Sequence, residues 1–408
     1  MLASLIPLFD DKTTVKAYSL ITQKTNMLLN PSLLGTGAND GAGSISGFEV
    51  IKSMGIDTIS KDEDIFVSVN NISIFTNIDE QCVNIPHERI VILMDKSVKP
   101  VDMYVNRLKE LKESGFKLAI RKLAVSEFEP YRNILLLADY VFLDHKKIDI
   151  SKAKIYFSKV YPNIKLCAVN VGDQEAYDSL VEEGGYTLYE GDFYRLPVTK
   201  GNNEVAPLKV NYIELLNIVN DADFDLTKAA DIIGRDTALV LKLLEMVNKM
   251  SVNSEITSIR HAAAMLGQKE LKKWINTAVT KELCADKPNE ITRVSLLRAK
   301  FAENLAPAFD KAGLSSELFL MGLFSVIDII LDMPMEDALK KIKVSKQIEN
   351  ALVRNEGEFA NILNFVVQYE QASWGEVDRL MLLENLDSKA VYEAYINSLI
   401  WYRDLFRS

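Results

Sequence analysis

The sequence predicts a two-part protein of the α/β plus all-α class, in which a (β/α) barrel-like half is followed by an all-helical half. The chain has 408 residues, which exceeds the comfortable size of a single hydrophobic core. Short β-branched or aromatic runs recur at steps of 26, 24, 24 and 22 residues, and such regular βα units are typical of a barrel. After about residue 208 the strand-like runs give way to helical periodicity. The strand-like runs begin at Ile90, Phe116, Tyr140, Ile164 and Tyr186.

The segments around these runs complete the predicted barrel. AYSLIT and IFVSVN, near residues 17 and 65, predict two further strands. Apolar residues at helical spacing predict a helix over residues 101–111 that ends near Gly115, and a second over 174–183 that ends at Gly184 and Gly185. Residues 33–47 are rich in Gly and Ser but match neither a Walker A nor a GxGxxG pattern, so we interpret them as a flexible loop.

The second half reads as a series of helices. Asp236 is a predicted N-cap and Gly267 a predicted helix end. GNNEVAP, residues 201–207, resembles a linker, so we place the domains at 1–200 and 201–408, with relative motion about residues 199–208. The aromatic segment 391–406 is expected to dock on the helical domain, and a dimer face is the alternative.

Composition narrows the classes of partner. The chain has 47 basic and 57 acidic residues, a net charge of −10, and this field disfavours nucleic acid as a partner. Three isolated cysteines suggest buried free thiols, and the longest apolar run, residues 318–331, is too short to span a membrane. We therefore expect a cytoplasmic protein that needs neither a membrane nor a cofactor.

Several anchors give the first half a family resemblance. IPLFD, LKELKESGFKLAI, LLLADYVFLD and GDFYRLP occur in this order over residues 1–200. In order and spacing they resemble EAL domains, the cyclic di-GMP phosphodiesterases, in the variant fused to a C-terminal HDOD domain. The resemblance implies a shortened TIM-like barrel whose strand ends hold two divalent cations that activate a water.

The residues at the implied metal positions depart from that pattern. The resemblance assigns the signature glutamate to Ser19, the metal-binding asparagine to Asn70, and later positions to Leu93, to Arg121 and Lys122 in place of an aspartate pair, to Phe142, to the retained Asp144, to Val169 and to Glu190. Two cations in place of two anionic ligands would repel a dinuclear site. This pattern predicts a degenerate barrel without phosphodiesterase activity, that is, not an enzyme.

Arg121 and Lys122 leave two interpretations open. They could grip the phosphates of cyclic di-GMP, since guanidinium groups suit phosphate oxygens. Alternatively, they could pair with Asp144 and Glu190 and fill the space of the metals, which is the interpretation that the neutral Ser19 favours. Binding of cyclic di-GMP is then not expected.

The second half resembles the HDOD domain through a series of spaced residues. They include Asp236, Asn248, Ser258, Gly267 and Trp274. HD-type metal phosphohydrolases, which are related in fold, need several histidines, whereas His261 is the only histidine after residue 145. The lysines at 269, 272, 273 and 281 are interpreted as a solvated helix face.

Together these observations predict a signalling adaptor or regulator that acts through protein–protein interaction. Its expected partners are other signalling proteins or a second copy of the chain. A metal-independent cyclic di-GMP effector and a residual phosphodiesterase are the two alternatives.

Overall fold

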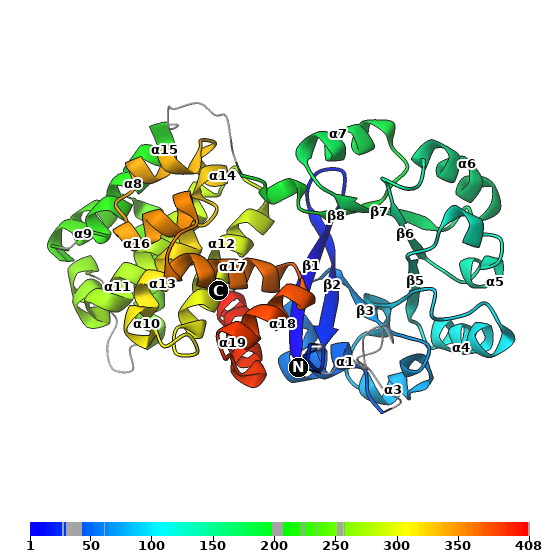
Figure 1. Ribbon diagram of the computed structural model, residues 1–408. Coiled ribbons are helices and arrows are strands. Elements are labelled where there is room, and N and C mark those ends of the chain that lie inside the picture. The colour runs from blue at the N-terminus through cyan, green and yellow to red at the C-terminus, as the bar shows by residue number, and fades with distance from the viewer. Residues whose placement is uncertain are drawn as a thin grey trace. The chain divides into compact units, whose positions relative to one another are not determined.

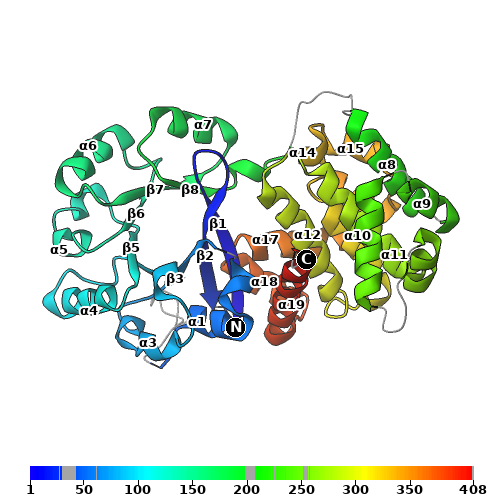
Figure 2. The same cartoon turned by 180° about the vertical axis from the view of Figure 1, so that it is seen from behind.

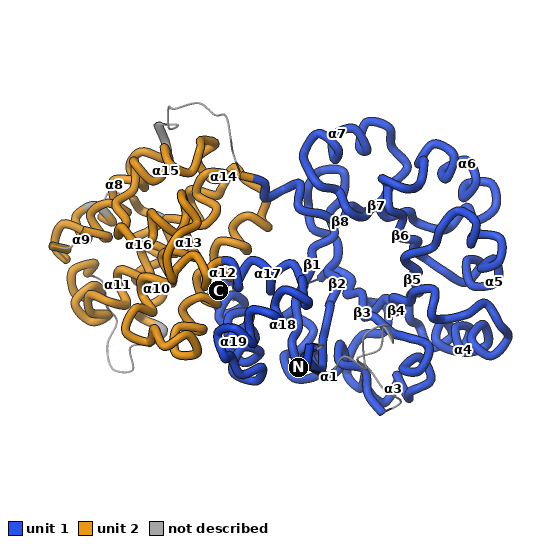
Figure 3. The backbone as a smooth tube through the Cα atoms, viewed as in Figure 1, with its two compact units in different colours: residues 1–196, 364–408 blue, residues 197–363 orange. Residues whose placement is uncertain are grey.

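The computed structural model describes residues 1–26, 28–29, 43–60, 62–197, 207–221, 223–224, 226–234, 236–250, 256 and 258–406. The chain forms two compact units. One comprises residues 1–196 and 364–408, and the other residues 197–363 (Figure 3). The predicted combination of an N-terminal barrel with a following helical region is confirmed.

Eight strands close the barrel in the order β1 to β8 (Figure 1). β1 runs antiparallel to both β2 and β8, and all the other neighbours are parallel. Every side chain of β4 is buried, as expected for a parallel strand covered on both faces. The strands are β1 (Leu2–Phe9), β2 (Val15–Gln23), β3 (Asp64–Ser68), β4 (Ile90–Met94), β5 (Lys117–Arg121), β6 (Tyr140–Asp144), β7 (Lys165–Val171) and β8 (Leu188–Gly191).

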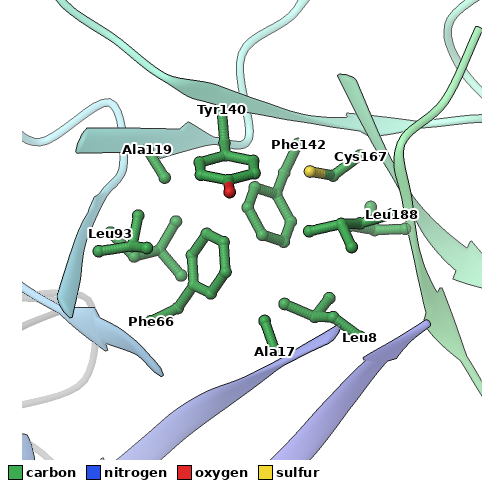
Figure 4. Close-up of a cluster of buried hydrophobic side chains, with 11 residues drawn as sticks. Leu8, Ala17, Phe66, Leu93, Ala119, Tyr140, Phe142, Cys167 and Leu188 are labelled. Carbon is green, nitrogen blue, oxygen red and sulfur yellow. The ribbon is translucent and has the colours of Figure 1, made fainter. Parts of the chain in front are cut away.

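The interior of the barrel is a packed core. Phe66 meets Tyr140 and Phe142 edge to face, with ring centroids 5.2 and 5.3 Å apart, the geometry that aromatic quadrupoles favour (Figure 4). Smaller residues, Ala17 on β2 and Ala119 on β5, lie among these rings in the same cluster. The centre is therefore filled, and any open space in the barrel must lie at its ends.

Helices surround the strands from outside (Figure 2). α4 (Asp102–Glu113) buries Tyr104, Val105, Leu108 and Leu111 and is followed by Gly115 at φ 94°. The N–H of Phe116 donates to the Leu111 carbonyl, and that of Gly115 to Lys112, which is a Schellman motif. The remaining helices of eight or more residues here are α1 (Ser46–Met54), α6 (Ile150–Val160) and α7 (Gln174–Glu183); α2 (Ile56–Ile59), α3 (Ile78–Gln81) and α5 (Arg132–Leu135) are shorter. The predicted ends at Gly115 and Gly184 are confirmed.

The C-terminal helices belong to the barrel unit, which corrects the expectation that segment 391–406 docks on the helical domain. α18 (Trp374–Leu383) and α19 (Ser388–Phe406) lie in this unit, and α19 contacts β1. β1 pairs with β8 only at Phe9, so its outer edge needs other partners. The Tyr369 and Tyr395 hydroxyls accept hydrogen bonds from the N–H groups of Ala3 and Leu5, at 3.2 and 3.3 Å. The sequence gives no sign of this role, because the unpaired N–H groups of β1 and the two tyrosines are brought together only when the chain folds.

The helical unit is an assembly of short and long helices. Asp236 caps α10 by accepting a bond from the Leu239 N–H at 3.1 Å, and Gly267, at φ 75°, interrupts α11, so both predicted helix signals are confirmed. α12 and α13 approach closely at Gly322, where a Cβ atom would lie 2.5 Å from the Arg298 backbone. The helices are α8 (Pro207–Val219), α9 (Leu226–Ile233), α10 (Thr237–Met250), α11 (Ile259–Leu283), α12 (Asn289–Leu305), α13 (Ser315–Phe324), α14 (Ile327–Leu331), α15 (Met335–Lys341), α16 (Lys346–Glu349) and α17 (Glu358–Glu370), the last of which continues into the barrel unit.

The remaining predictions concern the loop 33–47, the linker 201–207, the cysteines and a membrane-spanning helix. Most of the predicted loop 33–47 and of the linker 201–207 lies outside the described residues, although Ser46 and Gly47 begin α1. All three cysteines are buried and free, as predicted. Among the described residues, no helix has the length and apolarity needed to cross a membrane.

Candidate functional site

The positions singled out by the sequence converge at one end of the barrel. Successive side chains of a strand point to opposite faces, so residues two positions beyond a core residue also face inward. Ala119 of the core is followed in this way by Arg121, and Leu188 by Glu190. The same spacing places Leu93, Asp144 and Val169 on the inner face near the carboxyl ends of their strands, and Ser19 on the inner face midway along β2, beside Phe66 of β3.

Arg121 and Glu190 form an ion pair across this mouth. The guanidinium Nη2 of Arg121 donates to Oε1 of Glu190 at 3.1 Å, and the side chains are only 22% and 15% exposed. The guanidinium carbon also lies 5.6 Å from the ring centroid of Phe142, in cation–π range. The other carboxylate oxygen of Glu190 is buried and has no hydrogen-bond partner among the described residues.

Lys122 lies near a different carboxylate, that of Asp95. Its ammonium lies 3.9 Å from the carboxylate of Asp95, which follows β4, and its side chain is 66% exposed. The backbone of Lys122 is in the left-handed region at φ 64°, which is uncommon for a residue with a side chain. The two adjacent cations therefore serve different partners, one inside the mouth and one at its rim.

Asp144 is bound by residues close to it in the sequence and by Asn170 of the next strand. Its carboxylate lies 2.8 Å from the Lys147 ammonium and accepts a bond from the Asn170 side-chain amide at 3.1 Å. Burial by itself would raise the pKa of Asp144, but the hydrogen bonds from Lys147 and from the Lys146 backbone outweigh it and hold the pKa below its usual value. Asp144 pairs with these neighbours rather than with Arg121 or Lys122, so only half of the expected salt-bridge pattern is seen.

The uncharged residues at the predicted positions include two polar ones, Asn70 and Ser19, and two apolar ones, Leu93 and Val169. Asn70 lies just beyond β3, and its Oδ1 accepts bonds from the N–H groups of Ile72 and Ser73 at 2.7 and 2.9 Å. Ser19 is fully buried, and its hydroxyl lacks a hydrogen-bond partner within the described part of the chain. Leu93 and Val169 belong to the apolar core cluster.

A cavity of about 640 Å³ opens at the mouth even though the Arg121–Glu190 pair is formed. Its size is within the range of small-molecule sites. Asn70, Leu93, Arg121, Lys122 and Glu190 line it, whereas Ser19, Asp144 and Val169 do not. Three cations, Arg121, Lys122 and Arg195, balance three acids, Asp95, Glu190 and Asp192. Within the described ranges, no group of three or more His, Cys, Asp or Glu residues is arranged to hold a metal ion.

Several lining residues were missed from the sequence. Asn170 is the penultimate residue of β7, at φ 61°, and Asp95 directly follows β4, so both lie at carboxyl ends of strands, where parallel barrels commonly place functional groups. Their position at the ends of predicted strands could have identified both residues from the sequence. Gln371 also lines the cavity, but nothing in the sequence links a residue so distant to the barrel mouth.

The motif residues of the helical unit have structural contacts rather than a shared site. The side-chain amide of Asn248 accepts a hydrogen bond from the Ile256 N–H at 2.7 Å and donates one to the Ile256 carbonyl at 3.0 Å. Ser258 is the N-cap residue of α11 without a side-chain bond, and Trp274 lies partly buried in the same helix. His261 is exposed.

Comparisons with known proteins show what the two halves of the chain are similar to. Residues 205–364 match the family model of the HDOD domain. The chain is 26% identical over 331 residues to the cyclic di-GMP phosphodiesterase CdgJ of Vibrio cholerae, which covers 80% of this chain and 76% of that protein. It is 26% identical over 412 residues to the uncharacterized protein YuxH of Bacillus subtilis, covering 98% and 97%. Among solved structures, a standalone EAL protein from Vibrio cholerae O395 with cyclic di-GMP bound aligns with a TM-score of 0.34 and 15% identity, over 47% of this chain and 90% of that one.

The expectation that the chain is not an enzyme is contradicted by its relation to CdgJ, which is named a phosphodiesterase. The exclusion rested on one arrangement of metal ligands, carried position by position from a resemblance. A relation over four-fifths of the chain outweighs such single positions. Hydrolysis of cyclic di-GMP therefore belongs among the activities to be assayed.

Proposed function

We propose that this protein is a regulator in cyclic di-GMP signalling whose barrel mouth binds the dinucleotide. The observation that carries the proposal is the cavity of about 640 Å³ next to Arg121, at the carboxyl ends of the strands. The choice of ligand is supported by the 26% identity to CdgJ, which is named a cyclic di-GMP phosphodiesterase. From the sequence alone we favoured a mouth filled by a salt bridge, but the pair between Arg121 and Glu190 leaves this space open.

The chemistry of the mouth suits an anionic ligand. Cyclic di-GMP carries two phosphodiester groups, and a guanidinium can meet phosphate oxygens in a bidentate manner. Arg121 is held at the inner end of the cavity, and the exposed Lys122 adds a second positive charge at the rim. Since the three cations and three acids of the lining balance, binding requires Arg121 to exchange Glu190 for a phosphate.

The output of the regulator would be contact with other signalling proteins. The match of residues 205–364 to the HDOD domain supports this assignment, because the motif residues Asn248 and Ser258 make structural contacts and leave the surface of this half available to a partner. We propose that the dinucleotide changes which partners are bound.

A second candidate is an adaptor that presents its surfaces without binding cyclic di-GMP. The formed Arg121–Glu190 pair favours it, because both charges are already satisfied in the free protein. The two candidates differ in one measurable property, the affinity of the barrel for the dinucleotide.

Calorimetric titration with cyclic di-GMP, with and without Mn²⁺, tests the proposal, and chromatography of the same samples detects hydrolysis. We expect saturable binding by the wild type and loss of binding in Arg121→Glu. Arg132→Glu is the matched control, because Arg132 is 55% exposed on α5, does not line the cavity and has Glu129 as its ion-pair partner in the described part of the chain. Thermal unfolding of each variant verifies folding, and Arg121→Gln repeats the test without charge reversal. Absence of saturable heat at millimolar ligand would reject the binding function in favour of the adaptor.

A further inference from the structure

The helical unit contains a second cavity, of about 580 Å³. It is bordered by α11 and α13, which contact each other, and by α16, which contacts α13. All of its lining residues belong to the unit of residues 197–363, so the cavity is separate from the barrel mouth. Its volume is again that of a small-molecule site.

One side of this cavity is apolar. Phe319 and Ile348 are 2% and 1% exposed and line the space together with Leu320 and Val344. Residues that are this well buried by their own unit form a fixed wall. Such a wall favours the apolar part of a ligand, because contact removes apolar surface from water.

The other side carries four lysines, two of which are already paired. The Lys273 ammonium lies 2.7 Å from the Glu303 carboxylate and 5.0 Å from the ring centroid of Phe319. Lys343 lies 2.6 Å from the carboxylate of Asp221. These two lysines hold the walls together and are less available to a ligand.

Lys269 and Lys272 lack a carboxylate within ion-pair distance among the described residues. Lys269 is exposed, and Lys272 donates only to the backbone carbonyl of Asp221, at 3.3 Å, with its ammonium 4.9 Å from the ring centroid of Phe224. Burial lowers the pKa of Lys272, although the charge of Asp221 opposes this shift. Lys269 and Lys272 are three positions apart on one helix, so their positive charges repel each other, and an anion between them would relieve the repulsion.

The backbone holds the lysines on this side of the cavity. Gly267, with φ 75°, interrupts α11, so a new helical segment starts directly before Lys269. Further along, Asn276 is 1% exposed and exchanges two amide hydrogen bonds with Asn220, at 3.0 and 3.1 Å. This pair ties α11 to the residue that follows α8, and so fixes the wall next to Lys272.

We propose that this cavity binds a small organic anion with an apolar body. The body would lie against Phe319, Leu320 and Ile348, and the anionic group would lie between Lys269 and Lys272. The lysine cluster that the sequence suggested as a solvated helix face would then be a binding site, with Lys281 outside it.

Two fluorescent probes of nearly equal shape test the charge. 8-Anilinonaphthalene-1-sulfonate carries one sulfonate, whereas N-phenyl-1-naphthylamine has the same rings without it. In titrations of the full chain, we expect the wild type to bind the sulfonate about tenfold more tightly than the neutral probe, which is the effect of one charge-assisted contact. The double variant Lys269→Glu/Lys272→Glu should abolish this preference and retain the neutral probe.

Matched variants locate the site. Lys340→Glu/Lys389→Glu changes the net charge equally at side chains that are 64% and 80% exposed and do not line the cavity, and it should bind both probes like the wild type. Ser316→Trp places a bulky ring at an exposed lining position and should weaken both probes. Equal affinity of the wild type for the two probes, or unchanged sulfonate binding in the Lys269→Glu/Lys272→Glu or the Ser316→Trp variant, would overturn the proposal.

Discussion

The two cavities of this protein differ in how their charges are satisfied. At the barrel mouth, three cations are matched by three acids, and the central Arg121 is already bound to Glu190. In the helical unit, four lysines face three acids, and two of the lysines lack a carboxylate partner among the described residues. A ligand of the barrel must therefore compete with the ion pair between Arg121 and Glu190. An anion in the helical cavity would instead meet Lys269 and Lys272, which have no such partner in the part of the chain that the structure describes.

The largest expected effects come from the glycines that let the backbone of each unit approach closely. A Cβ at Gly191, which lines the barrel mouth, would lie 2.0 Å from the Val171 carbonyl oxygen, and one at Gly322 would lie 2.5 Å from the Arg298 backbone. We expect Gly191→Ala and Gly322→Ala each to lower the free energy of unfolding by about 3 kcal/mol, since neither neighbour is a flexible side chain.

Hydrogen exchange followed by mass spectrometry assigns each loss to a unit. Gly191→Ala should weaken protection in barrel peptides and Gly322→Ala in helical peptides. Gly375→Ala is the control, because a Cβ there meets no atom within 4 Å. Unchanged protection in the unit that carries the substitution would contradict the close packing.

Glu190→Gln tests the competition at the barrel mouth. Removing the carboxylate charge frees Arg121 for the phosphate, so we expect cyclic di-GMP to bind about five to ten times more tightly. The measurement is a calorimetric titration at fixed ionic strength. Glu183→Gln is a suitable control, because Glu183 ends α7 and does not line the cavity. Weaker binding by Glu190→Gln would mean that this carboxylate contacts the ligand instead of competing with it.

The pH dependence of the two cavities should differ. Burial lowers the pKa of Lys272 and Lys273, so their positive charge is lost at a lower pH than that of a free lysine, whereas arginine keeps its charge. As the pH rises toward the usual pKa of lysine, binding of the sulfonate probe should weaken several-fold, whereas a contact made by Arg121 at the barrel mouth should persist. Binding of the neutral probe is the internal reference, and a parallel decline of both probes would refute the assignment to lysine charge.

The smallest effect is expected at Asp144. Its lowered pKa means that its ionised form stabilises the fold above the usual carboxyl pKa, and that this contribution is lost as the pH falls through the lowered value. Asp144→Asn should therefore cost less than about 1 kcal/mol at neutral pH, as for other ion pairs with an exposed lysine. Urea unfolding at pH 7 and pH 3 should show a smaller difference between the variant and the wild type at pH 3.

The barrel was predictable from the sequence where its strands are buried on both faces. The run IVILM coincides with β4, and the helix end at Gly115 follows from the need for a positive φ. β1 was not recognised as a strand, because it pairs antiparallel with β2 and its remaining edge is completed by Tyr369 and Tyr395 from far along the chain. Contacts at that sequence distance follow from closure of the barrel and leave no local pattern.

The candidate site was predictable in position but only partly in its contacts. The resemblance to EAL domains placed Arg121 and Glu190 at one end of the barrel, and the structure joins them. The resemblance did not foresee that Asp144 would bind Lys147, three residues further on, because a local partner is reached without crossing the barrel. The cavity in the helical unit was invisible, since its walls come from helices that are distant in sequence.

A crystal structure of the protein with cyclic di-GMP would test the central claim most directly. The account predicts the dinucleotide in the barrel mouth, with the Arg121 guanidinium on a phosphate and its bond to Glu190 broken. A dinucleotide bound elsewhere on the chain, or a mouth in which Arg121 still binds Glu190 at saturating ligand, would contradict it.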